Sequence, residues 1–266
     1  MAATAEGTLL TARHRRVQAG ITARTLRLVA ATWPLLDLRR LDDTAPGWAA
    51  QALGLLRGGH ALSARAAMSY FAAYRLAEGA TGSPPDVVAP ALDLEAARTS
   101  LLVTGPVAIK QATGRGTGIE QAGRDALSRV LASSQRHVQA GGRGVIVEAV
   151  RRDRQALGWA RVASADACAF CGMLASRGAV YKSEDSGEFE AHDGCGCDVE
   201  AAYSGWQPPE SSLLWEDRYV AANGGDEEFR AQRLEAFRAG RVPPPRGKHT
   251  PQQLRELAAY MRSGRA

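Results

Sequence analysis

Cys168-Ala-Phe-Cys171 is followed after 20 residues by His192-Asp-Gly-Cys195-Gly-Cys197, and these two short segments contain every cysteine of the 266-residue chain. They lie between Trp159 and Tyr203, where no long helical period continues. Two short strands are predicted there, Trp159–Val162 and Gly178–Tyr181. We therefore expect a compact α+β module whose structure differs from that of the segments before and after it.

The spacing of the cysteines and of His192 predicts a structural Zn²⁺ site. A Cys-x-x-Cys pair can place two thiolates on one metal, and His192 with Cys195 can complete a tetrahedral sulfur and nitrogen set, which suits zinc without redox chemistry. Five donors compete for four positions. Because Cys195 and Cys197 would point to opposite sides of a regular strand, we favour Cys168, Cys171, His192 and Cys195, with Cys197 as the alternative fourth ligand.

Three other interpretations of the cysteines stay open. They could be small buried residues with His192 on the surface, or they could form disulfides or a thioredoxin-like redox pair, although no βαβ pattern surrounds them. A catalytic zinc is less expected than a structural one, because four protein ligands leave no position for an activated water. The seven acidic residues and no basic one between Ser183 and Glu200 argue against a zinc knuckle that reads nucleic acid.

Residues 1–158 are predicted to form a helical body. Apolar residues recur at helical spacing from Leu9 to Trp33. Further helices are expected at Trp48–Arg57, Ala61–Glu78, Leu92–Ala112, Ile119–Ala140 and Val145–Gly158. Gly105-Pro106 should interrupt one of these helices and Gly141-Gly142 should end another. The glycine-rich segment Thr113–Gly118 is interpreted as a helix-to-helix connection, because it lacks the Gly-Lys-Ser/Thr ending of a phosphate loop.

Residues 204–266 are predicted to form an extended C-terminal arm. It contains one helical stretch near Glu227–Ala239 and a closing helix at Pro251–Arg262. The expected fold class is thus a mainly α N-terminal helical body (1–158), a small zinc-stapled α+β module (159–203) and this arm. A module of about 45 residues buries too little apolar surface to fold alone, so a metal would supply the missing stability.

Charge is divided unevenly along the chain. Residues 1–160 contain 20 Lys and Arg against 12 Asp and Glu, whereas residues 161–266 contain 13 against 16. A basic N-terminal half is compatible with contact to nucleic acid or to an acidic protein, but its arginines are dispersed, and arginine-rich usage also fits a GC-rich genome. No stretch approaches 18 consecutive apolar residues and no secretory signal is visible, so no membrane association is expected.

A search for catalytic residues finds one Ser/His grouping. Ser128, Ser133 and Ser134 lie near His137 on one predicted helix, where a Ser–His pair three or four residues apart can touch. Backbone N–H groups inside a helix are already hydrogen-bonded and cannot form an oxyanion hole. No Gly-x-Ser-x-Gly or His-Glu-x-x-His motif occurs. No catalytic residue is therefore assigned.

The module resembles that of the minor head proteins of tailed actinobacteriophages, relatives of the Mu F-like head-morphogenesis proteins. The resemblance is carried by Gly158-Trp-Ala-Arg-Val, by Cys168-Ala-Phe-Cys171-Gly-Met-Leu-Ala-Ser-Arg-Gly and by the His192–Cys197 segment, and Leu101-Leu-Val-Thr-Gly-Pro106 is similar as well. It implies that the four cysteines and His192 form one module after a helical region, and it supplies no catalytic residue. Gly196 departs from the common pattern, which has a basic residue between the last two cysteines.

The resemblance implies a minor structural protein of a phage head, acting in head assembly and in DNA packaging or exit. The expected partners are portal, capsid or scaffold proteins. Packaged DNA is considered as a further partner, which would contact the basic N-terminal half. No small-molecule substrate is expected. The expected location is the virion, in the head interior or at the portal vertex, with the host cytoplasm during assembly. Two alternatives remain, a capsid maturation protease and a DNA-binding zinc protein.

Overall fold

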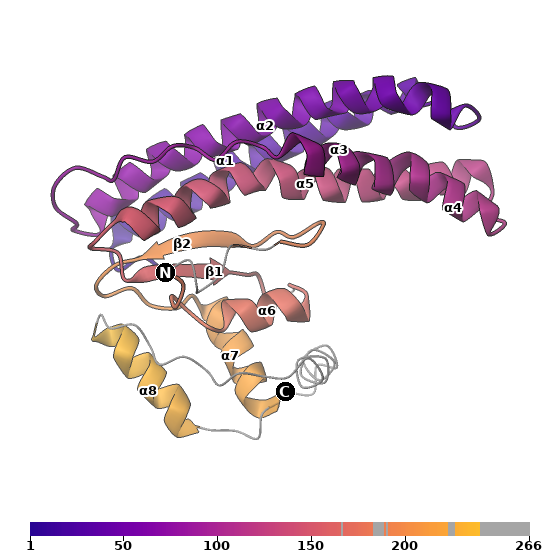
Figure 1. Ribbon diagram of the computed structural model, residues 1–266. Coiled ribbons are helices and arrows are strands. Elements are labelled where there is room, and N and C mark those ends of the chain that lie inside the picture. The colour runs from indigo at the N-terminus through magenta and orange to yellow at the C-terminus, as the bar shows by residue number, and fades with distance from the viewer. Residues whose placement is uncertain (166, 183–188, 190, 223–226, 240–266) are drawn as a thin grey trace.

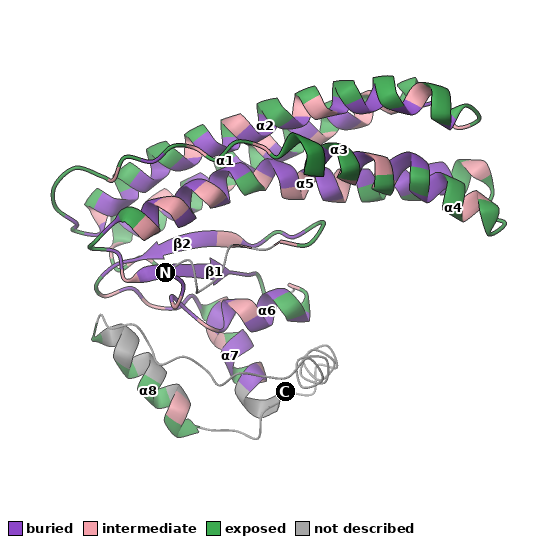
Figure 2. Ribbon diagram, viewed as in Figure 1, coloured by how far each residue is buried: buried purple, intermediate pink, exposed green. Residues whose placement is uncertain are grey.

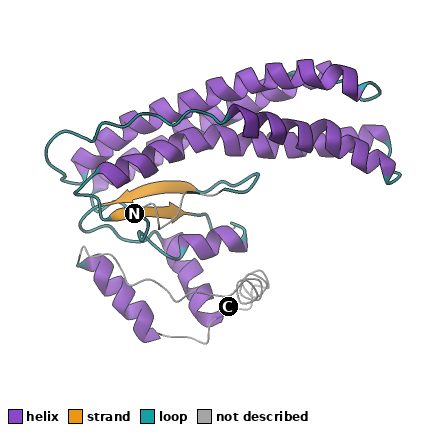
Figure 3. Cartoon of the chain, in the orientation of Figure 1, coloured by secondary structure: helices purple, strands orange, loops and turns teal. Residues whose placement is uncertain are grey.

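The computed structural model describes residues 1–165, 167–182, 189, 191–222 and 227–239. It is mostly helical with one small two-stranded sheet, which agrees with the helical body and the α+β module expected from the sequence (Figures 1 and 3). The closing helix predicted at Pro251–Arg262 lies outside the described residues. No helix in the described part of the chain combines the length and the apolarity that a membrane crossing requires.

Three long helices form the body: α1 (Ala5–Ala31), α2 (Leu41–Ala77) and α5 (Ile119–Arg152). Each carries a stripe of buried residues at helical spacing, and Figure 2 shows these stripes turned toward the neighbouring helices while the outer sides are exposed. Thr4 caps α1, because its side-chain oxygen accepts a hydrogen bond from the backbone N–H of Gly7 at 2.9 Å. Helix α2 packs against both of the others, and α1 and α5 also contact each other.

Shorter elements connect α1 to α2 and α2 to α5. Element η1 (Trp33–Leu35) links α1 to α2, and α3 (Leu94–Leu102), η2 (Val103–Val107) and α4 (Ala108–Gly114) lead to α5. The interruption expected at Gly105-Pro106 is confirmed: η2 is a π-helical turn around Pro106, whose missing N–H loosens the helical ladder. The connection predicted at Thr113–Gly118 is present but shorter, because α4 continues to Gly114 and only residues 115–118 link it to α5.

Two predicted helix breaks are wrong, because the glycines concerned allow close helix packing instead. Helix α2 runs without a break through Pro46 and Gly58-Gly59, and α5 runs through Gly141-Gly142. A Cβ atom on Gly59 would lie 2.5 Å from Thr25 Oγ1 of α1, and one on Gly141 would lie 2.3 Å from the backbone oxygen of His60. These glycines therefore let the three helices approach one another closely.

A methyl group at this helix crossing should be poorly tolerated. We expect Gly141→Ala to lower the free energy of unfolding by about 1–3 kcal/mol, because the new Cβ overlaps the backbone of α2 rather than a flexible side chain. The control is Gly54→Ala in the same helix pair, where a Cβ meets nothing within 4 Å. Alanine has the higher helix propensity, so Gly54→Ala should stabilise by up to about 1 kcal/mol. Urea unfolding of both variants measures the difference, and equal effects would contradict the assignment.

The sheet consists of β1 (Gly158–Val162) and β2 (Asp198–Ala202), paired antiparallel with Gly158 opposite Ala202 and Val162 opposite Asp198. The strand predicted at Trp159–Val162 is therefore confirmed, with Gly158 added at its start. The strand predicted at Gly178–Tyr181 is wrong, because only Tyr181 of this segment pairs with β1, through a single bridge to Trp159. The helix predicted at Val145–Gly158 is too long at its C-terminal end, because α5 stops at Arg152.

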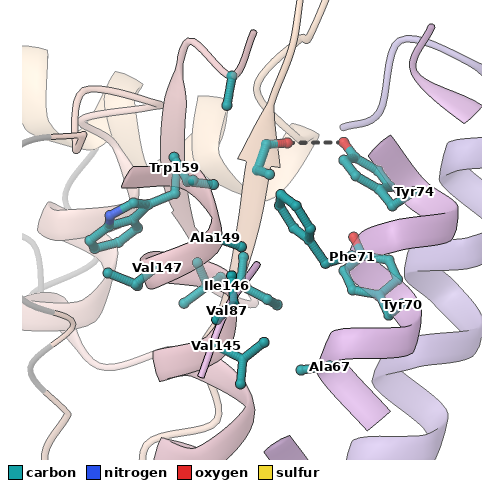
Figure 4. Packing of buried hydrophobic residues seen from close by; sticks show 14 of the residues in the cluster. Ala67, Tyr70, Phe71, Tyr74, Val87, Val145, Ile146, Val147, Ala149 and Trp159 are labelled. Carbon is teal, nitrogen blue, oxygen red and sulfur yellow. Dashed lines mark hydrogen bonds between the residues drawn. The ribbon is translucent and has the colours of Figure 1, made fainter. Parts of the chain in front are cut away.

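The sheet packs directly on the helical body. One hydrophobic cluster contains Phe71 and Tyr74 of α2, Ile146 of α5, Trp159 of β1 and Val199 of β2, and Figure 4 shows several of its members between the helices and the strands. The Tyr74 hydroxyl donates a 3.0 Å hydrogen bond to the backbone oxygen of Ala201 in β2. The core thus continues from the long helices into the sheet that carries the cysteines.

The sequence predicts an extended arm after the sheet, but the structure has a packed helix there. Helix α7 (Glu210–Ala222) packs against α6 (Ala169–Ala175), and Trp206 and Trp215 are buried. A Cβ on Gly172 of α6 would lie 2.2 Å from the Trp215 ring, so the glycine makes room for the indole. Trp215 and Tyr219 of α7 pack against Ala169 and Met173 of α6, whereas Trp206 packs in a separate cluster with Ala160 of β1. The helix expected near Glu227–Ala239 is present as α8 (Glu227–Arg238).

Candidate metal centre

All five ligands predicted from the sequence come together beside the sheet. Cys168 is the N-cap of α6 and Cys171 lies in its first turn, whereas His192, Cys195 and Cys197 lie in the turns that lead into β2. The antiparallel pairing of β1 and β2 brings these two stretches side by side. Gly194 has a φ of +74°, a left-handed conformation that suits glycine and lets the chain turn between His192 and Cys195.

The donor atoms form two groups that share Cys171. His192 Nε2 lies 3.1 Å from Cys168 Sγ and 3.2 Å from Cys171 Sγ. The sulfur atoms of Cys171 and Cys195 are 3.6 Å apart, and the Cys171, Cys195 and Cys197 donors all lie within 4.8 Å of one another. Sulfur ligands around a tetrahedral zinc are about 3.8 Å apart, given a Zn–S bond of about 2.3 Å. Each group of three donors therefore has a spacing suited to one metal ion, and four-fold ligation by donors of both groups requires the side chains to draw closer together.

His192 is oriented as a metal ligand. Its Nδ1 lies 2.8 Å from the backbone oxygen of Asp193, and because a carbonyl can only accept, Nδ1 carries the proton. Nε2 is then the nitrogen with a free lone pair, and it faces the sulfur atoms of Cys168 and Cys171. A hydrogen bond of this kind fixes the ring and the tautomer of many metal-binding histidines.

The surroundings favour thiolates at two of the cysteines. Burial by itself would raise the pKa of Cys168, but the backbone N–H of Cys171 and the neighbouring His192 hold it below its ordinary value. This position at a helix N-terminus is also where the helix dipole stabilises negative charge. Hydrogen bonds from Cys171 and Cys197 lower the pKa of Cys195. Metals bind the thiolate, so the shifts at Cys168 and Cys195 suit metal ligation, whereas the hydrogen bond with Cys195 raises the pKa of the Cys171 thiol.

Two buried arginines face the cysteine cluster. Arg161 of β1 is 2% exposed, and its Nη1 lies 4.0 Å from Cys171 Sγ and 3.9 Å from Cys195 Sγ. Arg143 of α5 donates from Nη2 to the backbone oxygens of Cys195 at 2.9 Å and Cys197 at 2.5 Å. Both guanidinium groups also lie over the ring of Phe189, at 4.8 Å for Arg143 and 3.8 Å for Arg161.

The arginines provide a test of whether a metal fits the site. Arg143 is buried, yet its Nε and Nη1 have no hydrogen-bond partner among the residues that the structure describes, and burial lowers its pKa. A buried cation is costly unless negative charge compensates it. Zinc bound by three or four thiolates carries net negative charge, so it would supply that compensation. The donor set and its charged surroundings therefore fit Zn²⁺.

One sequence argument about the ligands is corrected by the structure. Cys195 and Cys197 were expected to point to opposite sides of a strand, but β2 begins only at Asp198, and both cysteines are buried near Cys171. All four cysteines are free thiols in the structure. Arg143, Arg161 and Phe189 were not found from the sequence, because nothing in their local patterns distinguishes them from other apolar or basic positions.

The Ser/His grouping does not form a catalytic pair. Ser133 and Ser134 are fully buried in α5, and the Ser133 hydroxyl donates to the backbone oxygen of Val130 at 3.1 Å. Ser134 Oγ and His137 Nε2 have no hydrogen-bond partner among the described residues. Burial lowers the pKa of His137 to about 4. The hydrogen bond from nucleophile to base that serine catalysis requires is therefore not made.

Several acidic residues near the module are engaged in ion pairs. Asp193 pairs with Arg136 of α5 at 2.6 Å, and Asp198 and Glu200 of β2 pair with Arg15 of α1 at 3.1 and 3.5 Å. The remaining four acidic residues of this stretch (Glu184, Asp185, Glu188 and Glu190) lie outside the described residues. The acidic residues that the structure does describe hold the module against the helices.

The fold and the site define a class of protein in which a layer of long helices carries a cysteine and histidine module that is suited to a structural metal. The family model described as VG15 protein matches residues 9–222, so the chain belongs to the VG15 protein family, a family of phage proteins. It is also 42% identical over 66 residues to the Gene 15 protein of Mycobacterium phage D29.

That match is local. It covers 23% of this chain and 24% of the relative, so the chain spans about a quarter of the length of the curated relative it matches. No solved structure matches the chain.

Proposed function

We propose that the cysteine and histidine cluster binds one structural Zn²⁺ through Cys168, Cys171, His192 and Cys195. Cys171 is central to this assignment, since its sulfur lies within 3.6 Å of both His192 Nε2 and Cys195 Sγ. The bound ion would tie the start of α6 to the turn before β2. Arg161 and Arg143 would then balance the charge of the thiolates.

The fourth ligand can be identified by paired substitutions. With the proposed ligand set, Cys195→Ser is expected to lose stoichiometric zinc, whereas Cys197→Ser should retain about one equivalent. Zinc is measured by elemental analysis of the purified full-length variants, with circular dichroism as the check on folding. Zinc loss in Cys197→Ser together with retention in Cys195→Ser would instead identify Cys197 as the fourth ligand.

We further propose that the protein is a minor structural component of a phage head that acts in head assembly and in DNA packaging or exit. The observation that carries this proposal is membership of a phage protein family over residues 9–222, together with the phage origin of the Gene 15 relative. The resemblance of the metal module to Mu F-like head-morphogenesis proteins points the same way. Portal, capsid or scaffold proteins are the proposed partners, and the virion is the proposed location.

The structure also favours a non-enzymatic role over a capsid maturation protease. Ser134 and His137 are buried and make no hydrogen bond to each other, and they lie inside the continuous helix α5. The proposed metal has four protein ligands, which leaves no position for an activated water. Support for catalysis is therefore missing at both sites that the sequence singled out.

The head proposal is tested by comparing particles made with and without the gene. Mass spectrometry of gradient-purified heads from the wild-type phage is expected to find the protein at low copy number. An amber mutant should yield heads that are misassembled or empty, and expression of the wild-type gene from a plasmid should restore them. Normal, infectious particles that lack the protein would contradict the proposal.

A further inference from the structure

Helix α1 carries four exposed arginines along one face. Arg13, Arg16, Arg24 and Arg27 are separated by 3, 8 and 3 residues, which are close to whole numbers of helical turns. The buried residues of α1, among them His14 and Thr22, lie on the opposite face. The four exposed side chains therefore form a row that points away from the helical core. We call this row the arginine stripe.

The arginine stripe has no carboxylates near it on its own helix or along most of α2. Residues 7–36 and 44–77 contain no Asp or Glu. None of the four arginines forms an ion pair within the described residues, in contrast to Arg15 on the same helix, which pairs with Asp198 and Glu200. Two more exposed arginines of α2, Arg57 and Arg65, add to the positive charge. Exposed helices usually mix both signs of charge, so this surface has an unbalanced positive field.

The length of the stripe indicates a polymer as the ligand. Arg13 and Arg27, the two ends of the stripe, are 14 residues apart, about 21 Å along the helix axis, so one small anion cannot contact both ends. A DNA duplex presents phosphates continuously along its backbone, with one charge per about 1.7 Å of its axis. Gly20, in the middle of the stripe, has open space where a Cβ would be, which allows close approach.

We propose that the arginine stripe of α1 binds the phosphate backbone of double-stranded DNA without reading its sequence. Aromatic side chains for stacking on bases are missing from the stripe, which favours a duplex over single strands. The inference extends the proposed function, because a head protein that acts in DNA packaging meets duplex DNA. It is tested on the purified protein, so its failure would leave the assembly role standing.

The test is fluorescence anisotropy of the full-length protein with a labelled 30-base-pair duplex between 50 and 300 mM KCl. The stripe variant is Arg13→Gln/Arg16→Gln/Arg24→Gln/Arg27→Gln. The control variant removes the same charge elsewhere, at four other exposed arginines, as Arg115→Gln/Arg124→Gln/Arg129→Gln/Arg154→Gln. Circular dichroism and zinc content verify that both variants are folded.

We expect the plot of log affinity against log salt concentration to be less steep for the stripe variant, with the magnitude of its slope reduced by about 3–4. Binding at 50 mM KCl should weaken by at least about 100-fold. The control should change affinity by less than about threefold. An equal loss in both variants would overturn the proposal, as would the absence of salt-dependent DNA binding by the wild type. Tighter binding of polyglutamate than of the duplex would also overturn it and would identify an acidic protein as the partner.

Discussion

Substitution of Cys171 by serine is expected to abolish stoichiometric zinc binding and to lower the melting temperature by about 10 °C or more. Cys171 is the one donor common to both groups of three, so its loss leaves neither group complete. Metal binding free energy becomes folding free energy when the site forms only in the folded chain. Loss of a few kcal/mol shifts the melting temperature of a chain of this size by about that amount.

The matched control for this variant is Ala175→Ser. Ala175 is buried in the same hydrophobic cluster as Cys171, Cys195 and Cys197, but it offers no metal ligand. The control therefore reports the cost of a buried hydroxyl alone, about 1–3 kcal/mol. We expect Ala175→Ser to keep one equivalent of zinc. Zinc retained in Cys171→Ser, or equal destabilisation of the two variants, would contradict a metal role for Cys171.

Asp153→Asn is expected to destabilise the protein by about 3–5 kcal/mol, because it leaves the buried guanidinium of Arg75 without a counter-charge. Arg75 Nε donates to Asp153 Oδ2 at 2.8 Å, and both residues are at most 5% exposed. The Tyr203 hydroxyl donates to the same carboxylate oxygen at 2.8 Å. This network links α2, the end of α5 and the segment after β2, so its loss should weaken the contact between the helices and the sheet.

Two further measurements examine this network. Asp125→Asn, at an exposed position of α5, should change the free energy of unfolding by less than about 0.5 kcal/mol. The double variant Arg75→Met/Asp153→Asn should recover part of the loss, since it no longer buries an unpaired cation. Urea unfolding measures all four proteins. If Asp153→Asn cost no more than the surface control, the assigned role of the ion pair would be wrong.

The Asp153 carboxylate makes the free energy of unfolding depend on pH in the acid range. Burial alone would raise the pKa of Asp153, but hydrogen bonds from Arg75, the backbone N–H of Gln155 and Tyr203 hold it below its ordinary value. A lowered folded-state pKa contributes stability that is complete above the unfolded pKa of about 3.9 and is lost as the pH falls through the folded value. The stability difference between wild type and Asp153→Asn should therefore be constant near pH 6–7 and shrink below about pH 4. A difference that grew toward acid would contradict this linkage.

Helical periodicity located the long helices, but the sequence could not show where they stop. Gly59, Gly141 and Gly142 have the same local appearance as helix-ending glycines, and only the neighbouring helices show that they are contact positions. The existence and position of α2 and α5 could therefore be predicted, but each was predicted as two separate helices. Whether a glycine ends a helix or allows close helix packing depends on a tertiary contact, which the neighbouring residues in the sequence do not reveal.

The missed strand β2 has a different cause. Its sequence, Asp198-Val-Glu-Ala-Ala202, carries two carboxylates, which are uncommon in strands. Glu200 is nevertheless 2% exposed, because Arg15 of α1 and the indole N–H of Trp206 satisfy its carboxylate. A strand whose buried charge is balanced by a distant helix cannot be recognised from its own residues.

The five candidate ligands were found from spacing alone, since metal-binding side chains cluster in short motifs. The arginines around them were not, because Arg143 and Arg161 reach the site from α5 and β1, at positions that only the folded chain brings together. The sequence thus predicted five candidate ligands, which the fold brings together, and the fold added two arginines whose positive charge a thiolate-rich metal centre would need.

The central claim, that a zinc ion held by the cysteine and histidine cluster stabilises this phage protein, is tested most directly by native mass spectrometry of the full-length wild type purified without added metal. We expect one zinc ion per chain, protection of the three ligand thiols (Cys168, Cys171 and Cys195) from reagent until a chelator removes the zinc, and a lower melting temperature after removal. A metal-free protein with reactive thiols and a melting temperature unchanged by chelator would contradict the claim.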